Sequence, residues 1–266
     1  MDNVNKTLYI PLYGKSFVSK KGIILRDAKA EEIWDAEGFL LKGKSRSKWL
    51  AYYMAMRAAT FDRWLAEKMS GNPRATVLHI GCGMDSRIER VGDRAAAWFD
   101  VDFPEVIDQR KRYFAESETY RMLGGDLRDG AFLKEVPGGV GIVVMEGISM
   151  YLKPQELKAA LEGICTHFER MYLLMDCYSV FAAKASKYKN PIRDVGVTEV
   201  YGLDDPRILT GKGLEFVREQ IMTPEDMIGQ LDGLEQKIFR KLYAGKTAGK
   251  MYRMYEFEGG RNDSEG

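Results

Sequence analysis

The chain has 266 residues, of which 45% are apolar and 30% charged, and its formal net charge is +1. A chain of this length and composition can bury a full core, which predicts one globular α/β domain with an added segment. Its 40 basic and 39 acidic residues nearly cancel, so no surface for binding a polyanion is indicated. The sequence has no run of about 18 apolar residues, which excludes a transmembrane helix.

Two further features bear on location and chemistry. The first residues, MDNVNKTLYIPLYGKS, lack the basic-then-apolar order of a secretory signal peptide, so a cytoplasmic protein is expected. The cysteines Cys82, Cys165 and Cys177 form no CxxC pair, and His79 and His167 are the two histidines. This leaves little material for a zinc site or a histidine-dependent triad, and no metal is expected.

Helical and strand-like patterns alternate along the chain. Apolar side chains recur at spacings near three and four over residues 45–70, which predicts a helix that ends at Gly71-Asn72-Pro73. Short apolar runs separated by helical segments follow, and they predict strands over residues 76–80, 95–101, 120–123, 141–145 and 171–175. This alternation indicates a parallel, doubly wound α/β sheet.

The rest of the chain is less regular. Residues 178–215 are rich in Lys, Tyr, Gly and Asp and are expected to form an insertion over the carboxyl edge of the sheet. A helix is predicted to begin near residues 223–226, and alternating side chains over residues 250–257 predict the last strand. The final residues, 259–266, have the composition of a disordered tail.

A nucleotide site is indicated where the first predicted strand ends. The strand over residues 76–80 runs into Gly81-Cys82-Gly83, and glycine lets the backbone approach a ligand closely. Asp100 and Asp102 lie 19 and 21 residues after Gly81, at the end of the next strand. That spacing places a carboxylate beside the ribose of a bound nucleotide. The alternative is a tight turn followed by an acid that caps a helix.

The residues after the glycine turn bear on which nucleotide is bound. An NAD fingerprint has a third small residue, usually Gly or Ala, where Ser86 stands, and it offers its pyrophosphate a helix N-terminus. Asp85 would meet that phosphate with like charge. S-adenosylmethionine has no phosphate and carries a positive sulfonium, so acids beside the turn favour it over NAD.

Three other positions are candidates for the same site. Asp126 and Leu127 follow the third strand in GGDLRD and could contact adenine, although a surface turn has the same pattern. Glu146 ends the apolar strand over residues 141–145, where ligands of open α/β sheets bind. Arg57 lies in a mostly apolar helix, and a buried arginine needs an anion; the alternative is a surface arginine with a buried stem.

Four segments in this order, GCGMDSR, WFDVDFPEVIDQRK, GGDLRD and EGISMYLKPQEL, resemble the leucine carboxyl methyltransferase family. Together with TLYIPLYGKS they are similar to its bacterial branch of tetracenomycin polyketide-type O-methyltransferases. The resemblance covers roughly residues 8–175. It implies a class I S-adenosylmethionine-dependent methyltransferase: a Rossmann-like doubly wound α/β sheet, mostly parallel with an antiparallel last strand. A helical lid over residues 1–70 and a core over 71–258, with the cap at about 178–215, are expected.

The resemblance also implies roles for residues at the methionine end of the donor. Gly81, with Gly83 in the same loop, lies against the methionine part. Glu146 lies near the sulfonium and the amino group. Arg57 matches the family's helical arginine that holds the donor carboxylate, and Lys15 matches a lysine of the lid.

The remaining roles concern the nucleoside and the methyl acceptor. Asp102 is matched to the acid that binds the ribose hydroxyls, with Asp100 as the other candidate, and Asp126 and Leu127 to the adenine contacts. Tyr151 matches a tyrosine that lines the acceptor side and is the predicted catalytic residue. Tyr201 is predicted to bind the acceptor, because the cap is rich in tyrosines (Tyr178, Tyr188 and Tyr201) and lysines. The alternative is an ordinary amphipathic lid, which has the same composition.

The predicted function is transfer of the methyl group of S-adenosylmethionine to a carboxylate or hydroxyl of a small, polyketide-like molecule, with S-adenosylhomocysteine as product. No nucleic-acid or membrane partner is expected. No dedicated general base is evident, and His79 is interpreted as a packed core residue. The alternatives are methylation of the terminal carboxylate of a protein, an NAD(P)-dependent oxidoreductase, and a donor-binding protein without catalysis.

Overall fold

The computed structural model describes residues 8–37, 43–186, 199–245 and 249–261. Within these residues seven strands form one sheet in the order β3-β2-β1-β4-β5-β7-β6. Their bounds are β1 Thr76–Ile80, β2 Ala97–Asp102, β3 Tyr120–Gly124, β4 Val140–Met145, β5 Arg170–Tyr178, β6 Glu215–Gln220 and β7 Tyr252–Gly259. The helices are α1 Tyr9–Lys21, α2 Ala28–Glu37, α3 Lys48–Gly71, α4 Arg87–Val91, α5 Pro104–Arg110, α6 Pro154–His167, α7 Val180–Ser186, α8 Glu225–Ile228 and α9 Gly233–Leu242.

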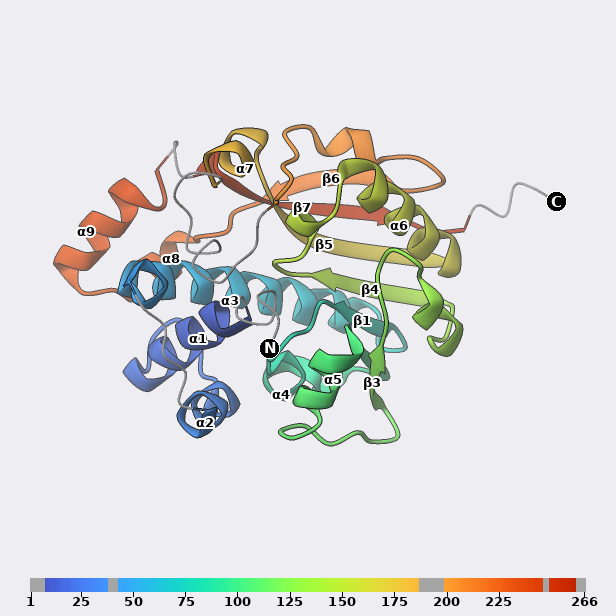
Figure 1. The fold of residues 1–266 in the computed structure, drawn as a ribbon, viewed down its shortest axis with the longest axis horizontal. Helices are drawn as coiled ribbons and strands as arrows, with labels where there is room; N and C mark the ends of the chain where they lie inside the picture. Colours follow the sequence, from blue (N-terminus) through green and yellow to red (C-terminus); the bar gives the residue numbers. More distant parts are fainter. Residues whose placement is uncertain (1–7, 38–42, 187–198, 246–248, 262–266) are drawn as a thin grey trace.

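The sheet confirms the predicted topology. Strands β3, β2, β1, β4 and β5 are parallel, and β7 inserts antiparallel between β5 and β6. Each parallel strand is preceded or followed by helical segments (Figure 1). The fold is therefore that of a class I methyltransferase sheet with an antiparallel end.

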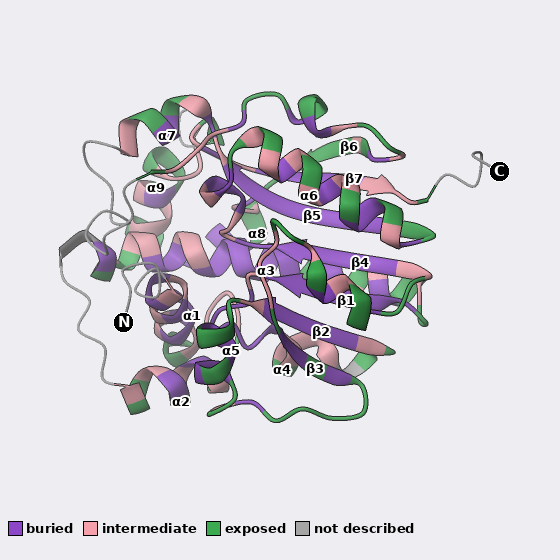
Figure 2. Ribbon diagram, turned by 45° about the vertical axis from the view of Figure 1, so that its right-hand side comes forward, coloured by how far each residue is buried: buried purple, intermediate pink, exposed green. Residues whose placement is uncertain are grey.

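Two hydrophobic clusters cover the two faces of the sheet, because successive side chains of a strand point to opposite faces. Val77, on one face, belongs to the cluster that contains Leu12, Phe61 and Trp64 from α1 and α3. Leu78, on the other face, belongs to the cluster with residues of α6. Strand β1 is accordingly buried along its whole length, and β2, β4 and β5 are buried except at their end residues (Figure 2).

Strand β6 was not predicted, and the structure shows why. Its sequence, EFVREQ, is mostly exposed at the edge of the sheet and lacks a continuous apolar run. The strand pairs with β7 with a register shift between Phe216 and Arg218. Polar composition, which favours a loop in isolation, is tolerated at an edge because one side of the strand faces water.

The chain boundaries differ slightly from those expected. The cap predicted over residues 178–215 contains α7 and a 3₁₀ turn at Pro206–Leu209, whereas residues 187–198, including Tyr188, lie outside the described residues. Gly259 is the last residue of β7, and the N–H of Arg261 donates to the carbonyl of Phe168 at 2.8 Å, so the sheet and its contacts continue into the predicted tail. No described helix combines the length and apolar character needed to cross a bilayer.

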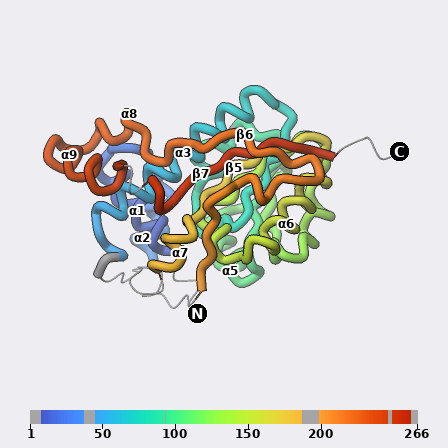
Figure 3. Tube along the Cα trace, turned by 90° about the horizontal axis from the view of Figure 1, so that it is seen from above, coloured from blue at the N-terminus to red at the C-terminus, as the bar shows by residue number. Residues whose placement is uncertain are grey.

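Helices α1, α2, α7, α8 and α9 gather at one end of the sheet (Figure 3), whereas α3 starts there and runs along one face of the sheet (Figure 1). Helices α1 and α3 pack on each other, and α1 also packs on α2. They place polar residues of the lid next to the carboxyl ends of β1 and β4. This is the end at which the cavity described below opens.

Candidate active site

A cavity of about 740 Å³ lies where the carboxyl ends of β1, β2, β4 and β5 meet α1 and α3. Its size falls within the range of small-molecule sites, roughly 300–1,000 Å³. Seven predicted site residues line it: Lys15, Arg57, Gly81, Gly83, Asp102, Glu146 and Tyr151. Residues more than 130 positions apart in the chain therefore share one cavity, as the nucleotide-site hypothesis requires.

The glycine turn after β1 has the backbone that only glycine adopts freely. Gly81 has φ +68° and Gly83 has φ +49°, both in the left-handed region. A Cβ at position 81 would lie 2.1 Å from Cγ2 of Ile148, and one at position 83 would lie 2.9 Å from Cδ2 of Leu8. Both glycines thus permit close packing of Ile148 and Leu8, which themselves line the cavity.

Asp102 is placed to act on a ligand and Asp100 is not. Asp102 Oδ2 accepts the N–H of Gly83 at 2.7 Å, and Oδ1 accepts the N–H of Phe103 at 2.8 Å, so the carboxylate is held against the glycine turn. Burial raises the pKa of Asp102 to about 6, although these two backbone N–H groups oppose the shift. Asp102 lines the cavity, which keeps it the candidate ribose ligand.

Asp100 is instead part of the core. Its carboxylate accepts hydrogen bonds from Trp98 Nε1 at 2.9 Å, Arg110 Nη2 at 2.5 Å and the Tyr120 hydroxyl at 2.6 Å. Burial by itself would raise the pKa of Asp100, but Arg110 and the hydrogen bond from His79 outweigh it and hold the pKa at about 2. Because Asp100 is fully buried and its carboxylate already accepts these hydrogen bonds, it cannot also bind the hydroxyls of a ribose.

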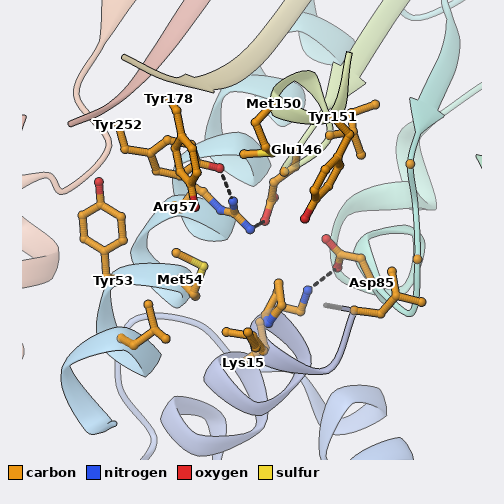
Figure 4. Close-up of a pocket in the computed structure, with 18 of the residues that line it drawn as sticks. Lys15, Tyr53, Met54, Arg57, Asp85, Glu146, Met150, Tyr151, Tyr178 and Tyr252 are labelled. Atoms are coloured by element: carbon orange, nitrogen blue, oxygen red, sulfur yellow. Dashed lines mark hydrogen bonds and ion pairs between the residues drawn. The ribbon is translucent and has the colours of Figure 1, made fainter. Parts of the chain in front are cut away.

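Arg57 is buried beside the carboxyl ends of β4 and β5 (Figure 4). Its Nη2 pairs with Glu146 Oε1 at 2.9 Å, and its Nη1 pairs with Asp176 Oδ2 at 3.0 Å and with the Tyr252 hydroxyl at 2.6 Å. Arg57 is therefore buried and paired with anions, which decides between the two alternatives that its apolar helix left open. Its Nε–H has no hydrogen-bond partner, which is unusual for a buried donor.

Glu146 lies between two arginines. It accepts a hydrogen bond from Arg87, which is fully buried, and forms an ion pair with Arg57. Burial alone would raise the pKa of Glu146, but Arg57 and Arg87 outweigh it and lower the pKa. Glu146 consequently stays ionised at neutral pH and presents a negative charge at the wall of the cavity.

Lys15 reaches the cavity from the lid helix α1. Its Nζ lies 3.2 Å from Asp85 Oδ1, and both side chains are buried. The segment Gly14-Lys15-Ser16 lies within α1. Burial would raise the pKa of Asp85, yet Arg90, Lys15 and Arg87 together hold it well below the usual range.

The part of the cavity next to Arg57 is lined by aromatic rings and methionines. The rings of Tyr53 and Tyr178 lie 6.3 and 4.9 Å from the ring of Tyr252, centroid to centroid. Figure 4 shows Met54 and Met150 beside them, and the hydroxyl of Tyr151 turned into the cavity between Glu146 and Asp85. We call the part lined by Tyr53, Met54, Tyr178, Met251 and Tyr252 the tyrosine chamber.

Most of the tyrosine chamber was not predicted from the sequence. Tyr53 lies one helical turn before Arg57 on α3, so the helical periodicity could have placed both on one face. Asp176 and Tyr252 carry no local signal, because they reach Arg57 only through the pairing of β5 with β7.

Three predicted site residues do not line the cavity. Asp126 accepts hydrogen bonds from the N–H of Arg128 at 2.9 Å and from its Nη1 at 2.8 Å in a turn after β3, and Leu127 packs against the apolar cluster under that turn. Tyr201 donates from its hydroxyl to Glu199 at 2.9 Å, and its N–H is bonded to the carbonyl of Met150. The structure therefore does not bring Tyr201 to the cavity wall.

The chemistry of the lining residues fits S-adenosylmethionine. Among the described lining residues, Lys15 and Arg57 are cationic and Asp85, Asp102 and Glu146 are anionic, which leaves one negative charge. The donor carries one net positive charge. Lys15 and Arg57 offer positive charge to the donor carboxylate, and Asp102 offers a hydrogen-bond acceptor. Among the described residues, no group of three or more His, Cys, Asp or Glu side chains could hold a metal ion.

Comparison with known proteins agrees with this geometry. The family model described as leucine carboxyl methyltransferase matches residues 3–165. The tetracenomycin polyketide synthesis O-methyltransferase TcmP of Streptomyces glaucescens is 27% identical over 241 residues, which are 89% of this chain and 89% of that protein. The S-adenosyl-L-methionine-dependent methyltransferase dpfgK of Gibberella zeae is 30% identical over 202 residues, 69% of this chain and 67% of that protein.

A solved structure shows the same fold. Magnesium protoporphyrin IX methyltransferase from Synechocystis, with bound S-adenosylhomocysteine, superposes with a TM-score of 0.50 at 14% identity, covering 88% of this chain and 94% of that chain. The family match spans the lid, the glycine turn, Asp102 and Glu146. It confirms the resemblance found in the four motifs and removes the oxidoreductase alternative. The chain belongs to the leucine carboxyl methyltransferase family, and it is a methyltransferase that depends on S-adenosylmethionine.

Proposed function

We propose that this protein transfers the methyl group of S-adenosylmethionine to a carboxylate or hydroxyl oxygen of a small, polyketide-like acceptor. The observation that carries the proposal is that one cavity joins the glycine turn and its charged residues to the tyrosine chamber. A donor and an apolar acceptor can therefore meet inside the same cavity. The similarity to TcmP, named for tetracenomycin polyketide synthesis, supports an acceptor of this kind.

The donor is assigned to the charged end of the cavity. Asp102 accepts hydrogen bonds from the ribose hydroxyls, and Glu146 faces the amino group and the sulfonium. Arg57 and Lys15 hold the donor carboxylate. Gly81 and Gly83 keep the turn close to the bound molecule.

Adenine is assigned to the neighbouring turn. The N–H of Gly125 donates to the carbonyl of Asp102 at 2.9 Å, so the turn that carries Asp126 and Leu127 lies directly beside the assigned ribose ligand. In this arrangement Asp126 binds the adenine amino group, and Leu127 covers the ring, once the Asp126 carboxylate exchanges its Arg128 partner for the ligand.

The acceptor is assigned to the tyrosine chamber, with Tyr151 at its junction with the donor site. Bound S-adenosylmethionine supplies a methyl group that is already activated by its positive sulfonium. The chain itself aligns the two reactants and excludes water, and such positioning lowers barriers by up to about 7–11 kcal/mol in well-oriented systems. A carboxylate acceptor is ionised at neutral pH and needs no base, whereas a hydroxyl must lose its proton.

Isothermal titration calorimetry tests the donor assignment. We expect binding of S-adenosylmethionine and S-adenosylhomocysteine in the micromolar range and no binding of NADH, because the acids beside the turn repel a pyrophosphate. Binding of NADH without binding of either sulfur nucleotide would overturn the proposal.

A transfer assay tests the acceptor assignment. The enzyme is incubated with methyl-labelled S-adenosylmethionine and, in parallel, with a panel of aromatic acids, a panel of phenols and a peptide that ends in leucine. Label in a base-labile product of an aromatic acid identifies a methyl ester, and label in a base-stable product of a phenol identifies an ether. Label in the peptide alone would instead support methylation of a protein terminus.

A further inference from the structure

Asp176 is a buried acid that makes three hydrogen bonds beside the proposed donor site. It lies on β5 and is fully buried. Its Oδ1 accepts the N–H of Gly147 at 2.7 Å, and its Oδ2 accepts Arg57 Nη1 at 3.0 Å and the Tyr252 hydroxyl at 2.7 Å. One carboxylate therefore connects α3, the turn after β4 and strand β7.

Tyr252 completes this arrangement. Its hydroxyl accepts a hydrogen bond from Arg57 Nη1 at 2.6 Å and donates its own proton to Asp176. Burial raises the pKa of this hydroxyl well above its ordinary value, so Tyr252 stays protonated and remains a donor. Arg57 Nη1, Asp176 and Tyr252 thus form a closed triangle of hydrogen bonds. Tyr252 also lines the cavity, and its ring centroid lies 5.7 Å from Cζ of Arg57.

The triangle fixes both charged groups that the donor would meet. Nη1 donates to both Asp176 and Tyr252, and Nη2 pairs with Glu146, so the guanidinium plane has little freedom to turn. Through Gly147, the same carboxylate also fixes the turn that carries Glu146. Gly147 has φ +76°, and a Cβ there would lie 3.3 Å from Arg57 Nη1, so the turn is packed directly on the guanidinium. Arg57 itself lines the cavity, so the guanidinium is fixed at the wall where the donor would bind.

We infer that Asp176 and Tyr252 are positioning residues for donor binding, which hold the guanidinium of Arg57 in place at the cavity wall, where it meets the donor carboxylate. The inference rests on the proposed donor role of Arg57. Neither residue is assigned to bind the donor directly. We expect both residues to affect donor affinity only by orienting the Arg57 guanidinium. A residue that contacts the ligand, or one that only stabilises the fold, would not depend on Arg57 in this way.

A double-mutant cycle on the full-length protein tests the inference, with S-adenosylhomocysteine as the probe and Kd from calorimetry as the readout. Tyr252→Phe keeps the ring and removes the hydroxyl, and it should weaken binding about tenfold in the wild-type background. In the Arg57→Lys background, where no guanidinium remains to be positioned, Tyr252→Phe should change Kd less than about twofold. Tyr255→Phe is the matched control, because Tyr255 is a buried tyrosine of the same strand that does not line the cavity, and it should leave Kd unchanged.

The results of this experiment distinguish a failure of the inference from a failure of the proposed function. An equal loss from Tyr252→Phe in both backgrounds would overturn the inference, since the hydroxyl would then act on the ligand itself. No loss in the wild-type background would also overturn it. If wild-type protein fails to bind S-adenosylhomocysteine at all, the proposed function fails first. Asp176→Asn should weaken binding by about tenfold or more, and if that variant does not fold, the Tyr252 cycle decides alone.

Discussion

At the scale of single residues, Asp100 and Asp102 show how two acids on one strand acquire opposite properties. They lie two positions apart and so share a face of β2. Asp100 is inside the sheet, where Arg110, Trp98 and Tyr120 surround it, and its pKa falls to about 2. Asp102 ends the strand at the cavity, where burial prevails and its pKa rises to about 6. The motif FDVD by itself does not indicate which aspartate is hydrogen-bonded within the core and which one faces the cavity.

The raised pKa of Asp102 predicts a pH dependence of donor binding. The ionised carboxylate accepts two hydrogen bonds from a ribose, and the protonated form cannot accept both. Affinity for S-adenosylhomocysteine should therefore be constant well above pH 6 and fall as the pH is lowered through about 6. Calorimetry between pH 5 and 8 measures the profile.

The matched variants are Asp102→Asn and Asp108→Asn. Asp102→Asn should bind more weakly at pH 7.5 and show a flat profile, because the titrating group is gone. Asp108 is exposed on α5 and does not line the cavity, so Asp108→Asn should reproduce the wild-type curve. A wild-type profile that is flat down to pH 5 would contradict the ribose role of Asp102.

The structure confirms that His79 is a packed core residue, although His79 also lines the cavity. Its Nε2 accepts a hydrogen bond from Arg87 Nη1 at 3.0 Å, so Nδ1 carries the proton that is donated to Asp100 at 3.0 Å. Burial lowers the pKa of His79 below its ordinary value. The imidazole is therefore neutral and fully engaged, which argues against a role as general base.

At the scale of elements, the lid is attached to the core by a buried ionic cluster. Arg90 of α4 donates to Asp27 at 2.6 Å, to Asp62 at 2.6 Å and to Asp85 at 2.9 Å, which lie before α2, on α3 and before α4 respectively. Its side chain is 7% exposed. Because Asp85 also pairs with Lys15 of α1, the cluster joins the lid to the cavity wall.

Removal of Arg90 should destabilise the protein strongly. Arg90→Met leaves three buried carboxylates without one of their cations, and breaking such a buried network costs about 3–5 kcal/mol. The free energy of unfolding from urea titration measures the loss. Arg63→Met is the control on α3, because Arg63 and Asp226 pair at the surface with 53% and 58% of their side chains exposed. An exposed pair contributes about 0–1 kcal/mol, so equal losses from the two variants would contradict the role of the cluster.

At the scale of the whole molecule, the lid and the sheet share one core. The same apolar cluster contains Leu12 and Ile33 from the lid together with Val77, Trp98 and Met254 from the sheet. A lid that contributes to this core cannot leave it without exposing the sheet face beneath. The predicted boundary near residue 70 therefore does not separate two hydrophobic cores.

Shared packing predicts one cooperative unfolding transition. Far-ultraviolet circular dichroism and tryptophan fluorescence in urea should give coincident midpoints, since tryptophans lie both in the lid, at Trp34, and in the sheet, at Trp98. S-adenosylhomocysteine at about 100 times its Kd should raise the free energy of unfolding by about 2.7 kcal/mol by both probes. Two separated midpoints, or stabilisation seen by one probe only, would show that the lid folds independently.

The sequence by itself determined those parts of the protein whose signal is local. The strands β1 and β4 follow from short, mostly apolar runs, because a central strand that is buried on both faces is largely apolar. The glycine turn, Asp102 and Glu146 directly follow such strands, so the parallel order of the sheet brings them to one edge, as predicted. Lys15 and Arg57 were placed by the family resemblance, and both line the cavity.

The features that depend on contacts between distant elements were decided only by the tertiary structure. The hold on Arg57 by Asp176 and Tyr252 arises from the pairing of β5 with β7, which joins residues 76 positions apart. Whether Tyr201 reaches the cavity depends on the path of the cap, and the edge strand β6 exists because β7 offers it a partner. No local pattern encodes these contacts, since a side chain's partners are set by which strands and helices become neighbours when the core is formed.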